Sequence, residues 1–149
     1  MGGNTLRIGE VAHELGEVIL SITDRAEADW DLEFDLFCDC RNLTRPGFAL
    51  NSLTVLGLRK WSELADVVLA VGAIDETNEL LESVVCEPGG TLELDQLCVE
   101  FGAFVEERMP VHLKAVCERR DNAGNMLDAE VPISGTFVAR VEVRRPYAS

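Results

Sequence analysis

Apolar and polar residues alternate through one stretch of the chain, WDLEFDLFCDC at positions 30–40. Successive side chains of a β-strand point to opposite faces, so this alternation predicts a strand with one buried face. The turn residues of NLTRPG (42–47) end the strand, and FALNSLTVLGL (48–58) can return as another. The predicted core face of 30–40 carries Trp30, Leu32, Phe34, Leu36, Cys38 and Cys40, and the other face carries Asp31, Glu33, Asp35, Phe37 and Asp39.

The segment before this strand combines two periodicities. Apolar residues from Ile8 to Leu15 recur at helical spacing, whereas Val18, Leu20 and Ile22 alternate. We therefore predict a short helix over 6–15 and a strand over 17–23. The loop RAEAD (25–29) would join this strand to 30–40 in an antiparallel hairpin.

The middle of the chain predicts helices less clearly. Ser62, followed by Glu63, resembles a helix start, and the apolar residues of 64–74 can form its buried face. The alternative is that ADVVLAVGAI (65–74) is a buried strand. Asp75 can begin a second helix that ends at Pro88.

The last third of the chain predicts mostly strands. Residues 91–108 fit either a helix or strands, because their apolar positions satisfy both periods. VHLKAVCER (111–119), MLDAEVPI (126–133) and TFVARVEVRR (136–145) alternate, and DNAG (121–124) is a turn sequence, so we predict a three-stranded meander. The predicted fold is one α+β domain over 1–149, with an antiparallel β-sheet (N-terminal hairpin plus C-terminal meander) and two or three packed helices.

The composition fits a single folded domain with an acidic surface. The chain has 149 residues, 47% of them hydrophobic, and a formal net charge of −14. Residues 1–105 hold 6 basic and 20 acidic residues, whereas 106–149 hold 7 of each. A surface this acidic repels phosphate backbones, so we expect no direct binding to nucleic acid. We expect no membrane segment and a cytoplasmic location, or a virion if the gene is phage-derived, because the chain shows no spanning apolar run or signal pattern.

Two charged groups form the candidate interaction surface. Side chains two apart on a strand lie about 6.5–7 Å apart, too far for the carboxylates of 30–40 to close on one metal ion by themselves. They form either a solvated face or a docking surface, and the arginine-bearing end of the chain could bind them in a second copy by head-to-tail contact. The residues concerned are Asp31, Glu33, Asp35, Asp39, Arg140, Arg144 and Arg145.

No catalytic, cofactor or metal site is predicted. Motifs for nucleophilic catalysis and nucleotide phosphates are absent, and His112 and Cys117 would point to opposite faces of one strand. Cys38 and Cys40 share a strand face with aromatic residues, which favours buried thiols over a zinc site. The loop DNAGN (121–125) lacks the residue order of a calcium loop.

These observations predict a protein that is not an enzyme. We expect an assembly subunit, such as a phage, virion or scaffold component, whose protein partners are copies of itself. The alternative is a small acidic inhibitor, such as an immunity or anti-defence protein, that binds a basic partner.

Overall fold

The fold consists of strands. The computed structural model describes residues 3–24, 31–38, 46–72, 78, 80, 83–88, 90–121 and 123–144. Apart from one short 3-10 helix, every regular element within these ranges is a β-strand. The elements are β1 (Asn4–Ile8), β2 (Val11–Leu15), β3 (Ile19–Thr23), β4 (Leu32–Phe37), β5 (Gly47–Val55), η2 (Trp61–Leu64), β6 (Val68–Val71), β7 (Val84–Glu87), β8 (Gly90–Phe101), β9 (Arg108–Arg120) and β10 (Met126–Arg144).

The strands form one sheet that closes on itself through β9, which pairs with both β10 and β8. β10 pairs with β9 along most of its length, with β1 through its middle residues Ile133–Thr136 and with β3, in parallel, through its last residues. β8 likewise pairs with β9, and it pairs with β7 through its first residues and with β6 through its last. The strands β3, β4, β5 and β7 complete the ring between β10 and β8.

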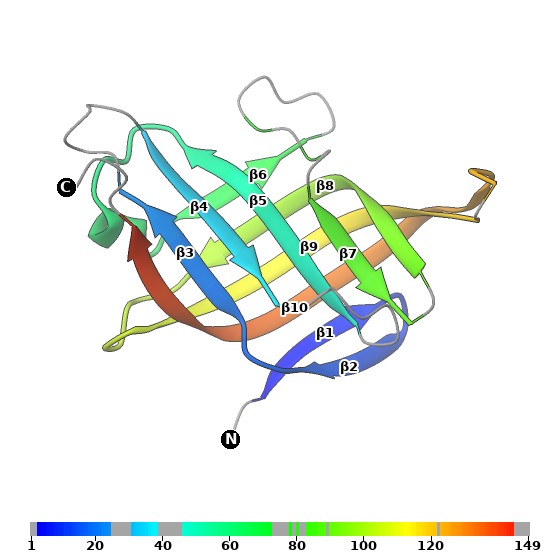
Figure 1. Ribbon diagram of the computed structural model, residues 1–149, viewed down its shortest axis with the longest axis horizontal. Helices are drawn as coiled ribbons and strands as arrows, with labels where there is room; N and C mark the ends of the chain where they lie inside the picture. The colour runs from blue at the N-terminus through cyan, green and yellow to red at the C-terminus, as the bar shows by residue number, and fades with distance from the viewer. Residues whose placement is uncertain are drawn as a thin grey trace.

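Two layers result, which share β8 and β10. In Figure 1 the strands β3, β4, β5 and β7 lie in front and run along one diagonal, whereas β8, β9 and β10 lie behind and run along the other. The back layer has the order β2-β1-β10-β9-β8-β6. Its outermost strands, β2 and β6, each pair with a single neighbour among the described residues.

The core fills the space between the layers. The predicted alternation of β4 is confirmed, because Leu32, Phe34 and Leu36 are fully buried. The ring of Phe34 contacts that of Phe101 on β8 edge to face, with centroids 5.2 Å apart. Phe48 on β5 meets Phe137 on β10 at 4.9 Å. Aromatic pairs from different strands therefore join the two layers through the interior. Trp30, also predicted for this core, lies outside the described residues.

The predicted α+β class is wrong, and the segment 6–15 shows why. It forms the hairpin β1–β2, in which Ile8 pairs with Val11 around a two-residue turn. Gly9 occupies the first turn position with φ +61°, which glycine adopts without strain. The alternating Leu6 and Ile8 are buried, so burial selects the strand period although the helical period was also present.

The other predicted helices are also strands or lie outside the described part. Ser62 does not cap η2, and the N–H groups of Arg59 and Lys60, which precede it, donate to the Glu63 carboxylate. After η2 the chain enters β6, which confirms the strand alternative for 65–74 but not its burial, because only Val71 of the four residues is buried. Residues 91–101 belong to β8. Of the segment 75–88, the structure describes β7 and a few single residues, and no helix among them.

The C-terminal strands were predicted in part. β9 and the turn after it are confirmed, and Asp121 Oδ1 accepts hydrogen bonds from the N–H groups of Ala123 and Asn125, both at 2.9 Å. The second and third strands of the meander, however, are one continuous strand, β10. Pro132 does not interrupt it, because this residue lies just beyond the last pairing with β1 and contributes its carbonyl oxygen to Gly9 N–H.

Candidate assembly surfaces

The acidic row lies on the outer face of β4 and also holds β5 in place. Asp35 Oδ1 accepts a 2.6 Å hydrogen bond from Ser52 N–H, at the point where the β4–β5 register shifts. Asp31 Oδ1 accepts one from Gly57 N–H at 3.2 Å and lies 3.8 Å from Arg59. These two carboxylates therefore have local structural roles. Glu33 lies between them on the same face, and Asp39 lies outside the described residues.

The arginines at the end of β10 differ in their surroundings. Arg140 donates to Glu17 at 3.0 Å and to Glu142 at 2.8 Å, and these hydrogen bonds raise the pKa of its guanidinium. Arg144 is exposed and forms no ion pair with any described residue. Arg145 lies outside the described residues. Arg140 therefore pairs within its own chain, and Arg144 is available to a partner.

The acidic row and these arginines share one surface. β3 separates them, with Ser21 between Glu142 and Asp35 and with Thr23 beside Arg144. Two strand spacings amount to about 9.5 Å. A head-to-tail contact needs complementary groups on different sides of the molecule, whereas this arrangement suits a two-fold contact. The contact between the acidic row of one copy and the arginines of another therefore remains a prediction.

The strand β6 forms one free edge of the back layer. Phe101 N–H donates to Val67 C=O at 2.9 Å, so the pair just before β6 is hydrogen-bonded. Hydrogen-bonded and non-hydrogen-bonded pairs alternate in an antiparallel ladder. Val68, opposite Glu100, and Ala70 are therefore non-hydrogen-bonded positions, whose N–H and C=O groups point away from β8. Val68 is 61% exposed.

The strand β2 forms the other free edge. In a hairpin with a two-residue turn the closing pair is hydrogen-bonded, here Ile8 with Val11. By the same alternation, the N–H and C=O groups of Ala12 and Glu14 point away from β1. Val11 is 58% exposed. Within the described part of the chain, the back layer therefore has unpaired backbone groups at both of its ends.

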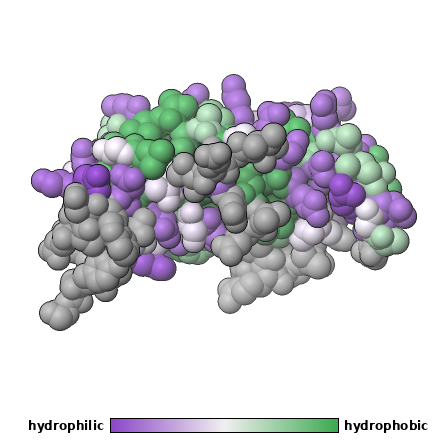
Figure 2. All heavy atoms as spheres, turned by 90° about the horizontal axis from the view of Figure 1, so that it is seen from above, coloured by the Kyte–Doolittle hydropathy of each residue, from purple (hydrophilic) through white to green (hydrophobic). Residues whose placement is uncertain are grey.

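A shallow groove of about 370 Å³ lies beside the β6 edge and continues over β8 and β9. Small side chains form part of its floor, and Lys114 is the one charged residue among the described residues that line it. β6 lies near the upper side of Figure 1, and Figure 2, which looks down on that side, shows hydrophobic side chains gathered among polar ones. The lining residues are Ala70, Val71, Gly72, Gln96, Leu97, Cys98, Lys114, Ala115 and Val116.

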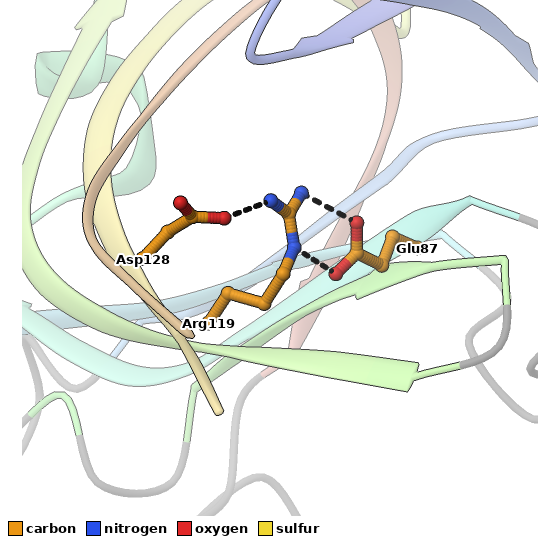
Figure 3. A network of polar contacts seen from close by, with 3 residues as sticks. All are labelled: Glu87, Arg119 and Asp128. Carbon is orange, nitrogen blue, oxygen red and sulfur yellow. Dashed lines mark hydrogen bonds and ion pairs between the residues drawn. The ribbon is translucent and has the colours of Figure 1, made fainter. Parts of the chain in front are cut away.

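A network of three charged residues closes one end of the interior. Arg119 on β9 lies on the same strand face as the buried Cys117, so it points between the layers. Its Nε and Nη2 donate to the two carboxylate oxygens of Glu87 on β7, both at 2.7 Å, and its Nη1 donates to Asp128 on β10 (Figure 3). These bonds raise the pKa of Arg119. The network joins three strands of the ring and has a structural role.

The cysteines and histidines of the described part show no catalytic arrangement. Burial raises the pKa of the Cys117 thiol to about 12. His112 points to the outer face, where its Nδ1 lies 3.3 Å from Thr136 Oγ1. Cys38 is buried and its Sγ accepts the N–H of Phe48 at 3.3 Å, whereas Cys40 lies outside the described residues. No group of three or more metal-ligating side chains occurs within the described ranges.

Sequence reasoning missed the β6 edge, its groove and the Arg119 network. The uncharged run VVLAV (67–71) was the available signal for the edge, and it was consistent with a buried element as well. None of the helices in the described part is long and apolar enough to cross a membrane. Comparisons of the chain with protein-family models, curated proteins and solved structures find no match.

Proposed function

We propose that this chain is a non-enzymatic assembly subunit that binds copies of itself through the free edges of its back layer. One observation carries the proposal. Within the described part of the chain, β2 and β6 have a single paired neighbour each, whereas every other strand has a neighbour on both sides for at least part of its length. An edge strand offers a row of unpaired N–H and C=O groups to another chain.

Apart from its short length of four residues, the β6 edge has none of the sequence features that usually protect an edge strand against such pairing. Soluble proteins commonly place lysine, proline or a bulge on an exposed edge strand. β6 has the sequence VLAV, with no charged residue and no proline, and Val68 is largely exposed. An unprotected edge favours a strand that is covered by a partner.

Net charge opposes association of identical chains, so the salt dependence of association distinguishes between the two candidate contacts. Each copy has a formal charge of −14, and the mutual repulsion is screened over about 8–10 Å at physiological salt. Association through the uncharged β6 edge should therefore strengthen as salt is added. Association through the acidic row and the arginines should weaken instead.

The second candidate is an acidic protein that binds and inhibits a basic partner. The outward carboxylates of β4 support it, together with the net charge. This function needs no contact between copies.

Sedimentation equilibrium over a range of protein and salt concentrations tests the proposal. We expect the average mass to rise above the 16.4 kDa of one chain as protein concentration increases, and to rise further with added salt. A mass of 16.4 kDa under all conditions would refute self-association and leave the acidic inhibitor as the better candidate.

A further inference from the structure

We infer that the side chains of Asn78 and Ser83 plug a further edge of the sheet, the second half of β5, and keep it from accepting a strand of another copy. β7 pairs with only the first residues of β5, Gly47–Ala49 (Figure 1). The later residues of β5 pair with β4 on one side and with no strand of the described part on the other. The inference goes beyond the proposed function, because it concerns an edge that the folded chain keeps closed.

The Asn78 side chain takes the place of a strand residue opposite Thr54. Its Oδ1 accepts a hydrogen bond from the N–H of Thr54 at 2.7 Å, and its Nδ2 donates to the C=O of Thr54 at 3.0 Å. Two residues of an antiparallel ladder exchange the same two bonds when they form a hydrogen-bonded pair. The side-chain amide therefore occupies the backbone groups of Thr54 to which a further strand would bind.

Ser83 extends the plug toward β7. Its Oγ accepts a hydrogen bond from the N–H of Asn51 at 3.0 Å, just beyond the last pair of the β5–β7 ladder. Asn78 and Ser83 are only 4% and 5% exposed, and burial of a polar side chain is costly unless it is hydrogen-bonded. The two buried side chains thus continue the β5–β7 ladder in place of backbone, at Asn51 and at Thr54.

The β6 edge shows the contrast. Its outward-pointing positions, Val68 and Ala70, form no hydrogen bond with a side chain of the described part. An edge with unbonded N–H and C=O groups is a template for another chain, and proteins cover the edges that must not associate. The plug of Asn78 and Ser83 therefore closes β5 to strand addition, whereas β6 stays open to it.

Removal of the plug should create a new site of association. Asn78→Ala combined with Ser83→Ala frees both N–H groups of β5, and Val68→Lys, opposite Glu100, blocks the β6 edge in every variant. Asn78→Asp combined with Ser83→Ala is the matched control, because it also loses the bond to the Thr54 C=O but places a charge at the edge. Thr54→Pro, added to the unplugged variant, removes the N–H that a new strand needs and leaves the β4–β5 ladder intact.

Sedimentation equilibrium, with circular dichroism as the check on folding, gives the outcome. We expect the unplugged variant to approach about twice the 16.4 kDa of one chain or more, and the control and the Thr54→Pro variant to keep the mass of the Val68→Lys protein. If the unplugged variant does not fold, Asn78→Ala and Ser83→Ala are compared singly in the same way. Folded variants without the plug that do not gain mass would overturn the inference, as would equal association after Thr54→Pro. A monomeric wild type would refute only the proposed function, because every variant here has a blocked β6 edge.

Discussion

Gly135 and Phe137 form the contact whose disruption we predict most specifically. They lie two residues apart on β10, on the same inward face, and both are buried. The ring of Phe137 covers Gly135 so closely that a Cβ built at position 135 would lie 2.2 Å from its Cζ and 2.9 Å from both Cε atoms. Contacts below about 3 Å do not occur between such atoms, so Gly135→Ala must displace the ring.

The Phe137 ring cannot move without a loss of packing free energy. Phe137 is 1% exposed, and its ring packs against Phe48 of the opposite layer at 4.9 Å. Overpacking of a core destabilises by about 1–3 kcal/mol, and a weakened aromatic pair adds about 0.5–1.5 kcal/mol. Alanine restricts the unfolded chain and offsets about 0.4–1 kcal/mol. The net loss in unfolding free energy for Gly135→Ala should therefore be about 0.5–4 kcal/mol, with a central value of about 2 kcal/mol.

Urea unfolding followed by circular dichroism measures this loss. Ser134→Ala, at the neighbouring outward position, is the control and should change the unfolding free energy by less than about 0.5 kcal/mol. In a Phe137→Leu background the smaller side chain should relieve the clash, so the effect of Gly135→Ala should shrink by at least about 1 kcal/mol. A loss that is equal in both backgrounds would refute the reasoning, because the ring would not be its cause.

Three further predictions concern the interior and the network at its end. Phe34→Ala should lower the unfolding free energy by about 3–5 kcal/mol in urea melts, because this fully buried ring fills the space between the layers; a loss under about 1 kcal/mol would contradict its burial. Cys117 should resist alkylation in the native protein at mildly alkaline pH, whereas the half-buried Cys98 reacts, as mapped by mass spectrometry. Alkylation of Cys117 and Cys98 at equal rates would contradict the burial of Cys117. Because burial raises the pKa of the Cys117 thiol from 9.0 to about 12, its contribution to stability should be complete below pH 9 and be lost as the pH rises toward 12, and pH-dependent melts can follow this loss. Glu87→Gln should lower the unfolding free energy by about 1 kcal/mol, because the partly exposed bidentate pair with Arg119 is lost, and high salt should reduce the difference between variant and wild type; a difference that salt leaves unchanged would exclude an electrostatic cause.

Strands with a strict period of two were predictable from the sequence, and the segments that satisfied two periods were not. β4 was found because acids and apolar residues alternate without exception from Asp31 to Leu36. The hairpin of β1 and β2 was missed because its apolar residues also recur at helical spacing across the turn at Gly9. Periodicity reports a buried face, and only the tertiary fold decided which element provides it.

Ring closure could not be predicted, since it depends on pairings between distant parts of the chain. β10 pairs with β1 and β3, from the opposite end of the sequence, and its pairing with β9 runs on through Pro132 and Gly135. The candidate assembly surfaces were predictable only where they depend on local sequence. The carboxylates of β4 were visible as a pattern, whereas the free edges at β2 and β6 exist only after every other strand has been paired.

A block of the β6 edge tests the proposed self-association most directly. Ala70→Pro removes an N–H that points away from β8, whereas Ala70→Ser keeps it and serves as the matched control. In sedimentation equilibrium the wild type and Ala70→Ser should exceed the 16.4 kDa of one chain, and a folded Ala70→Pro should have a lower average mass than either. If a folded Ala70→Pro assembles as the wild type does, the copies do not join through the β6 edge.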